Sequence, residues 1–306
     1  MHRNSTPPKV HVRYLSFYVV LVSFLIGYLL FKGVQMVRAS LFVSAPDRIN
    51  LVMYGPRTSF YSLDPKLGRH YQILFPADLK VDVPGGYGQY RIGSLGKLAR
   101  LDKNTHLIQK TFASTTTTFI HYTFSPNTDE VFYGSQLDET TSKPSIRHIL
   151  FDESNAHPLD RLYLAFGLLG ENSTAFKIIR YRQDEDSVLG ETVFNEETFR
   201  KNSLGLLFQS SYRDEQASVQ VLYPTQYRTG SRIATVLEGN GIRVSDISLD
   251  IKRSTQCRVA YSADVPTKTA RDIATYFSCP LVKEATDVYD ILFAVGEREK
   301  EWEILR

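Results

Sequence analysis

The feature that most constrains this chain is an uncharged, strongly apolar stretch near its start, over residues 14–31. Its roughly 18 residues would rise about 27 Å as an α-helix, which nearly crosses the hydrocarbon layer of a bilayer. Lys32 can extend its ammonium group toward the headgroups, so the uncharged run 33–37 can lengthen the span. We therefore predict a single transmembrane helix over residues 14–37.

A cleaved signal peptide is the competing interpretation of this stretch, because the small residues Val37 and Ala39 flank Arg38. Signal peptides, however, have apolar segments of only about 7–15 residues. The longer run favours an uncleaved signal anchor.

Positive charge is distributed unevenly about the predicted helix. The tail over residues 1–13 carries Arg3, Lys9 and Arg13 and no acidic residue, whereas the other flank has only Lys32 and Arg38 nearby. Short segments rich in Lys and Arg remain on the cytoplasmic side. We therefore expect a single-pass protein of the cell membrane, with its N-terminus in the cytoplasm and its C-terminal domains outside.

The net charge of +3 is contained in that tail, so the rest of the chain balances, with 36 − 3 = 33 basic residues against 33 acidic ones. No broad basic field remains to neutralise a nucleic-acid backbone, and we expect no nucleic-acid partner. The two cysteines, Cys257 and Cys279, are too few for a disulfide-rich scaffold or a four-cysteine zinc site. Two interpretations of this pair stay open: a disulfide bond, or two buried thiols that never meet.

After the apolar stretch, short strand patterns alternate with amphipathic helix patterns, which is typical of an α/β fold with mixed sheets. The pattern predicts helices over 94–108, 159–169, 229–238 and 267–277. It predicts strands over 49–54, 58–63, 70–75, 119–124, 176–181, 217–223, 257–263 and 290–295, with another strand beginning at 242 and strand or loop at 115–118. The turn residues 64–68 between the strands at 58–63 and 70–75 predict a β-hairpin. The elements from 217 to 295 follow the order β-α-β-β-α-β, which indicates a sheet covered by helices. The predicted divisions are a cytoplasmic tail, a transmembrane anchor, two exterior α/β domains and a charged tail, over 1–13, 14–37, 46–213, 216–298 and 299–306.

The C-terminal residues carry a family resemblance. Residues 218–244, SVQVLYPTQYRTGSRIATVLEGNGIRV, contain a strand, a helix of the form G-x-R/A-x-A-x-x-L and then G-(I/F)-x-V. Residues 257–297 add a strand, a helix with A-x-x-I-A and a final D-I-x-x-x-x-G. In this order the elements resemble the LytR-type C-terminal domain of LytR-CpsA-Psr proteins, over about a quarter of the chain.

The preceding segment is similar, more faintly, to the catalytic domain of the same family. Residues 75–92, FPADLKVDVPGGYGQYRI, align with an I-P-R-D segment that leads to a V-x-(I/V)-P-G turn. The resemblance implies transfer of a glycopolymer from a polyprenyl-pyrophosphate lipid to the cell wall, with magnesium helping to neutralise the phosphates. Such chemistry needs cationic side chains at the pyrophosphate and carboxylates for the metal.

Two positions depart from the family pattern. Ala77 stands where the arginine belongs, and Ser59 stands where the family has an aspartate after Arg57-Thr58. Together these changes remove most of the charge that would stabilise the transition state. Asp78 is kept and Arg91 lies near the usual basic residue, so Arg57, Asp78 and Arg91 are candidates for binding a phosphate or lipid headgroup. The alternative is that these three are ordinary surface or turn residues.

These observations predict a membrane-anchored cell-envelope protein that binds or scaffolds in glycopolymer attachment or envelope maintenance, with no catalytic residue and no metal or cofactor. The expected partners are the membrane and a cell-wall glycan, a polyprenyl-linked precursor or an envelope protein. The alternative is an active, magnesium-dependent phosphotransferase that moves the glycopolymer with a rearranged set of charges.

Overall fold

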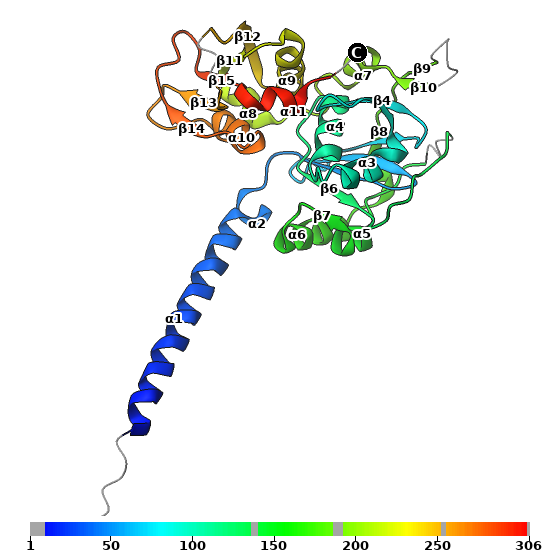
Figure 1. Cartoon of the computed structure of the whole chain (residues 1–306). Helices are drawn as coiled ribbons and strands as arrows, with labels where there is room; N and C mark the ends of the chain where they lie inside the picture. The colour runs from blue at the N-terminus through cyan, green and yellow to red at the C-terminus, as the bar shows by residue number, and fades with distance from the viewer. Residues whose placement is uncertain (1–9, 136–139, 186–191, 252–254, 305–306) are drawn as a thin grey trace, which may run out of the picture.

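The protein consists of a long N-terminal helix and a globular part built on three sheets (Figure 1). The computed structural model describes residues 10–135, 140–185, 192–251 and 255–304. Most of the predicted cytoplasmic tail, residues 1–13, lies outside the described residues. All three sheets are flanked by helices, and each contains both parallel and antiparallel strand pairs, so the predicted α/β class with mixed sheets is confirmed.

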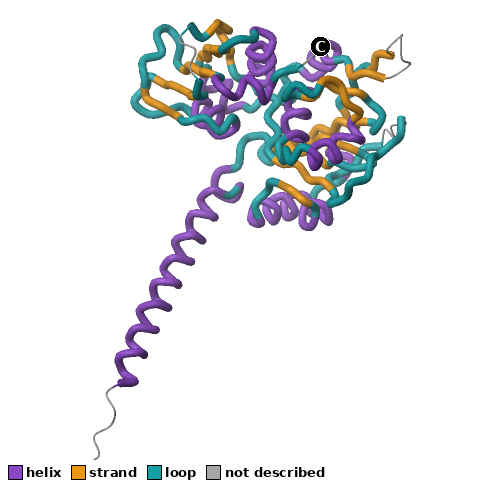
Figure 2. Tube along the Cα trace, viewed as in Figure 1, coloured by secondary structure: helices purple, strands orange, loops and turns teal. Residues whose placement is uncertain are grey.

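Helix α1 covers Val10–Ala39 and projects from the globular part as one continuous rod (Figure 2). Its segment Phe17–Arg38 has 22 residues and a mean hydropathy of 2.0, and none of that apolar segment is buried against the rest of the protein. Among the described helices it is the one long and apolar enough to cross a bilayer. An apolar surface of this size in water is unfavourable, so the helix fits the predicted anchor by length and composition.

The first sheet has six strands in the order β7-β6-β1-β2-β3-β8. Its strands are β1 Ile49–Met53, β2 Thr58–Leu63, β3 His70–Phe75, β6 Tyr122–Ser125, β7 Glu153–Ser154 and β8 Phe176–Ile178. The predicted hairpin is confirmed, because β2 pairs antiparallel with β3 and Thr58 lies opposite Phe75. Strands β6 and β8 pair parallel with β1 and β3.

The second sheet has the order β5-β4-β10-β9, with β4 Lys80–Val83, β5 Gly88–Arg91, β9 Gln183–Glu185 and β10 Thr192–Phe194. The helix expected over 94–108 is instead two helices, α3 Leu95–Leu101 and α4 Leu107–Thr116. Thr115 and Thr116, expected in a strand or loop, end α4. Their hydroxyls donate to the carbonyls of Thr111 and Phe112 one turn earlier, at 2.8 and 2.7 Å, which satisfies the polar side chains inside a buried helix.

The third sheet has the order β12-β11-β15-β13-β14. Its elements are β11 Ser218–Tyr223, α9 Tyr227–Gly239, β12 Arg243–Leu249, β13 Arg258–Tyr261, α10 Lys268–Tyr276, β14 Leu281–Lys283 and β15 Ile291–Ala294. The expected β-α-β-β-α-β order is present with one addition. Strand β14 was missed because three residues are too few to display a period of two.

Residues 299–304, expected as part of a charged tail, are packed against the rest of the protein. Helix α11 covers Glu299–Trp302, and Trp302 and Ile304 are 3% and 6% exposed. The Glu299 carboxylate accepts the N–H groups of Thr225 and Gln226 at 3.1 and 2.7 Å. Charged residues surround Trp302 and Ile304 in this segment, so its composition alone does not reveal that these two side chains are buried.

The remaining helices are α2 Leu41–Ser44, α5 Ile146–Phe151, α6 Pro158–Leu169, α7 Glu196–Ser203 and α8 Ser210–Glu215, with the short 3-10 turns Ile92–Ser94, Ser173–Ala175 and Gly296–Arg298. One large buried cluster runs from the first two sheets into the third. Within it Phe119, before β6, stacks on Tyr276 of α10 with ring centroids 4.2 Å apart. The sheets therefore share a continuous apolar core.

Candidate functional site

The hairpin of β2 and β3 positions the candidate site. Since Thr58 pairs with Phe75, the residues before β2 lie beside the residues after β3. This arrangement places Arg57 next to the Pro76-Ala77 segment at the edge of a pocket of about 760 Å³. Residues 133–135 form another part of its wall.

Asp78 organises that wall. One of its carboxylate oxygens accepts the N–H of Gly134 at 3.0 Å, and its own N–H donates to the carbonyl of Gly134 at 3.2 Å. Gly134 has a φ of 144°, which a residue with a side chain rarely adopts. Asp78 therefore fixes the 133–135 segment at the pocket.

Arg57 is exposed and is the one charged side chain among the described residues that line the pocket. Arg91 does not line it. It ends β5, where it pairs with Lys80 across the β4–β5 hairpin, and its side chain is exposed. Of the three predicted residues, Arg57 lines the pocket directly, and Asp78 contacts its wall through Gly134. Arg91 lies outside the pocket lining.

Ala77 and Ser59, the two positions at which the sequence departs from the pattern it resembles, lie close to Arg57. Ala77 is 2% exposed and lines the pocket with its methyl group in place of a cation. Ser59 is 5% exposed, and its hydroxyl donates to the carbonyl of Arg57 at 3.4 Å. Among the described lining residues, Arg57 therefore supplies the positive charge of the pocket.

The described residues around the pocket do not form a magnesium site. Magnesium requires near-octahedral oxygen coordination, usually with one or two carboxylates. Here Asp78 is engaged by the Gly134 N–H, and Ser59 is turned toward main chain. Over the described ranges, no group of three or more His, Cys, Asp or Glu side chains is placed to hold a metal ion.

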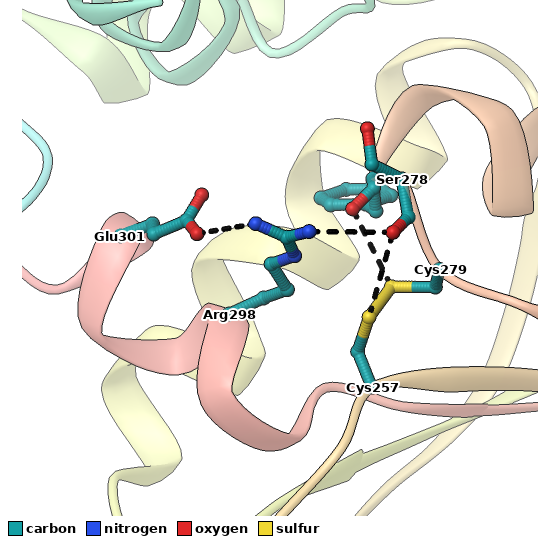
Figure 3. The surroundings of a disulfide bond; sticks show 6 residues. Cys257, Ser278, Cys279, Arg298 and Glu301 are labelled. Atoms are coloured by element: carbon teal, nitrogen blue, oxygen red, sulfur yellow. Dashed lines mark hydrogen bonds and ion pairs between the residues drawn. A yellow bond between two sulfur atoms is a disulfide. The ribbon is translucent and has the colours of Figure 1, made fainter. Parts of the chain in front are cut away.

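Cys257 and Cys279 form a disulfide bond with a Cα–Cα distance of 5.4 Å (Figure 3). It ties the residue before β13 to the loop between α10 and β14. Beside it the guanidinium of Arg298 donates to the carbonyl of Ser278 at 3.3 Å and pairs with Glu301. The bond belongs to the third sheet and lies apart from the pocket at Arg57.

Sequence reasoning missed the segment 133–135. It lies between the expected strand over 119–124 and the expected helix over 159–169, where no apolar period identifies an element, and it is a loop in the structure. The glycine after Phe132-Tyr133 is the only local signal of a special backbone position among these loop residues.

No protein-family model and no curated protein matches the chain. Solved structures with similarity to it include B. subtilis TagV, with 10% identity, a TM-score of 0.36 and coverage of 65% of this chain and 99% of that chain. B. subtilis TagU has 9% identity, a TM-score of 0.32 and coverage of 51% and 93%. The LytR-CPS2A-psr family protein YwtF (TagT), solved with bound octaprenyl pyrophosphate lipid, has 10% identity, a TM-score of 0.31 and coverage of 51% and 87%. Similarity at this level does not by itself assign a function.

Proposed function

We propose that this chain is a membrane-anchored cell-envelope protein of the LytR-CpsA-Psr type, which binds a phosphate-bearing, lipid-linked glycopolymer precursor without turning it over. The family part of the proposal rests on the motifs in residues 75–92 and 218–297. The anchor rests on the apolar, unburied segment Phe17–Arg38 of α1.

The observation that carries the binding role is the pocket with Arg57 at its rim and Ala77 in its wall. A guanidinium can bind two phosphate oxygens at once, so one arginine contributes both affinity and orientation. Transfer of a phosphoryl-linked group needs more, because the developing charge must be met by several preorganised cations or a metal. A pocket with one arginine and an alanine is suited to holding such a headgroup rather than cleaving it.

Placement outside the cytoplasm is supported by two independent features of the chain. The basic residues Arg3, Lys9 and Arg13 precede α1 without acidic neighbours, which favours retention of that end in the cytoplasm. The Cys257–Cys279 disulfide lies on the opposite side of the anchor, and disulfides persist in oxidising compartments.

The test uses the full-length protein in detergent micelles and a fluorescent polyprenyl-pyrophosphate lipid. We expect Arg57→Ala to weaken binding about tenfold, which corresponds to about 1.4 kcal/mol for a lost charge-assisted hydrogen bond. Arg91→Ala is the matched control, because it removes the same charge from an exposed arginine outside the pocket lining. Equal binding by the Arg57→Ala variant and the native protein would refute the site.

The same preparation tests the competing activity. Incubation with magnesium and a glycosylated polyprenyl-pyrophosphate should give no transfer product. Substantial magnesium-dependent transfer that Asp78→Ala abolishes would instead establish the phosphotransferase.

A further inference from the structure

Helix α6 is apolar on both of its sides. Leu164 and Leu168 are 2% exposed and pack into the cluster beneath the first sheet. On the other side Leu162, Phe166 and Leu169 are 42%, 63% and 62% exposed. Their spacing of i, i+4 and i+7 places them on one face of the helix. A helix that faces water normally carries polar side chains there.

The charged residues of α6 do not reach this outer face. Asp160 is 3% exposed and accepts the N–H of Leu41 at 2.8 Å. Arg161 donates to the carbonyls of Ile149 and Asp152 at 3.1 and 2.8 Å and thereby caps the end of α5. Both charges are used inside the fold, and residues 162–169 contain no charged side chain.

Helix α2 continues the same apolar surface. The ring of Phe42 packs edge-on against Tyr163 of α6 with centroids 5.2 Å apart. Phe42 and Val43 remain 54% and 62% exposed. We call the exposed side chains Phe42, Val43, Leu162, Phe166 and Leu169 the apolar face.

The apolar face lies where the membrane helix meets the globular part. Only Ser40 separates the end of α1 at Ala39 from α2. Leu41 is buried, and its bond to Asp160 fixes α2 on α6. Figure 1 shows α2, α5 and α6 on the side of the globular part from which α1 extends.

We propose that the apolar face inserts into the interfacial region of the lipid bilayer that α1 spans, and so fixes the globular part against the membrane surface. The inference rests on the membrane span in the proposed function. The bilayer is the occupant because α2, which carries Phe42 and Val43 of the face, follows the spanning helix after a single residue. Interfacial helices of this kind bury their apolar side about 5–10 Å into the headgroup and acyl boundary.

The test attaches an environment-sensitive fluorophore to single introduced cysteines of the full chain in phosphatidylglycerol vesicles. The native cysteines are joined in the disulfide, so only the introduced thiol reacts. Phe166→Cys probes the apolar face, and Leu25→Cys, in the middle of α1, probes the span. Leu204→Cys is the matched control, because this 72% exposed leucine directly follows α7. Figure 1 shows α7 on the side of the globular part away from α1.

Lipids with a nitroxide on the acyl chain then quench probes in contact with the membrane. We expect quenching at Phe166→Cys at least about threefold stronger than at Leu204→Cys, and strong quenching at Leu25→Cys. Equal quenching at positions 166 and 204, with position 25 quenched, would overturn the inference alone. No quenching at position 25 would overturn the membrane span and the inference together. A blue-shifted but unquenched probe at position 166 would show that protein, such as a second copy, covers the face, and would also overturn the inference.

Discussion

The environment of His121 keeps its imidazole neutral through burial and a hydrogen bond. Its Nδ1 accepts the N–H of Asn50 in β1 at 3.0 Å, which requires that nitrogen to carry no proton. Burial lowers the pKa of His121 from 6.5 to about 4, and the positive charge of Lys268 also lowers it, while Asp272 opposes the shift. The folded protein therefore keeps this imidazole neutral at neutral pH.

The depressed pKa predicts an acid-sensitive fold. Between pH 6.5 and about 4 the unfolded chain binds a proton at His121 that the folded protein excludes. The free energy of unfolding should be unaffected by this group above pH 6.5 and should fall as the pH is lowered toward 4, by about 2 kcal/mol after a discount because His121 as a residue is partly exposed. Thermal unfolding of the full chain in detergent at pH 7 and pH 5 measures the change.

His121→Gln supplies the control for this prediction, because glutamine keeps a hydrogen-bond acceptor and does not titrate. Its loss of stability between pH 7 and pH 5 should be smaller than that of the native protein. An equal loss in both proteins would assign the acid sensitivity to other groups.

At the scale of elements, the joint between α2 and α6 depends on one buried carboxylate. The Asp160 carboxylate accepts the Leu41 N–H. It also lies beside Tyr122, whose pKa is raised mainly by burial and further by the charge of Asp160 and its hydrogen bond. Asp160→Ala would leave the buried Leu41 N–H without its acceptor, at a cost of about 1–3 kcal/mol. Chemical denaturation of the full-length protein in detergent should show that loss.

Asp160→Asn is the isosteric comparison, since its amide oxygen can still accept the Leu41 N–H. It should be clearly more stable than Asp160→Ala. If both variants lose the same stability, the charge of Asp160 rather than the hydrogen bond to α2 holds the joint.

The elements that the sequence predicted are those with a long apolar period. Helices α6, α9 and α10 are of this kind, whereas the β2–β3 hairpin was predicted from the turn residues 64–68 between its strands. The strand expected over 176–181 is present but shorter, as β8 Phe176–Ile178. Strands β7 and β14 have two and three residues, so their positions depend on pairing partners far away in the chain. Local pattern cannot supply that information.

Two parts of the candidate site could be predicted from the sequence: Asp78, from the motif in residues 75–92, and the position of Arg57, from the β2–β3 hairpin. The motif in residues 75–92 identified Asp78, and the hairpin register brings Arg57 beside Ala77. Arg91 was grouped with them by its position after the glycine turn, but pairing with Lys80 at the end of β5 directs it elsewhere. The wall at Gly134 depends on a loop contact over 56 residues of sequence, which no local pattern encodes.

At the scale of the whole molecule, the C-terminal segment joins the third sheet to the rest of the globular part. The carbonyl of Glu303 accepts the N–H groups of Gly85 and Gly86 at 2.8 and 3.0 Å. Glu301 pairs with Lys110 of α4, and Trp302 packs on Phe277 with centroids 5.3 Å apart. Residues 301–303 therefore contact both the second-sheet region, at residues 85, 86 and 110, and the third-sheet region, at Phe277.

Deletion of residues 299–306 should therefore destabilise the protein and separate its unfolding steps. Removing a buried tryptophan alone costs about 3–5 kcal/mol, so we expect a midpoint lower by roughly 6–15 °C, with a broader or biphasic transition. Calorimetry of the full-length and shortened chains measures both effects. Glu303→Gln keeps the main-chain carbonyl and should unfold like the native protein; a similar loss in that variant would point to the side chain instead.

The orientation of the whole chain can be tested through its own disulfide. If the basic tail holds the N-terminus in the cytoplasm, then replacing Arg3, Lys9 and Arg13 with glutamine should invert part of the population. Inverted molecules would carry Cys257 and Cys279 into a reducing compartment, where they would remain thiols. Maleimide labelling of acid-quenched cells should reveal that thiol fraction, and neutralising Lys32 and Arg38 on the other flank should not produce it. A fully oxidised pair in the tail variant would mean that the tail charges do not set the orientation.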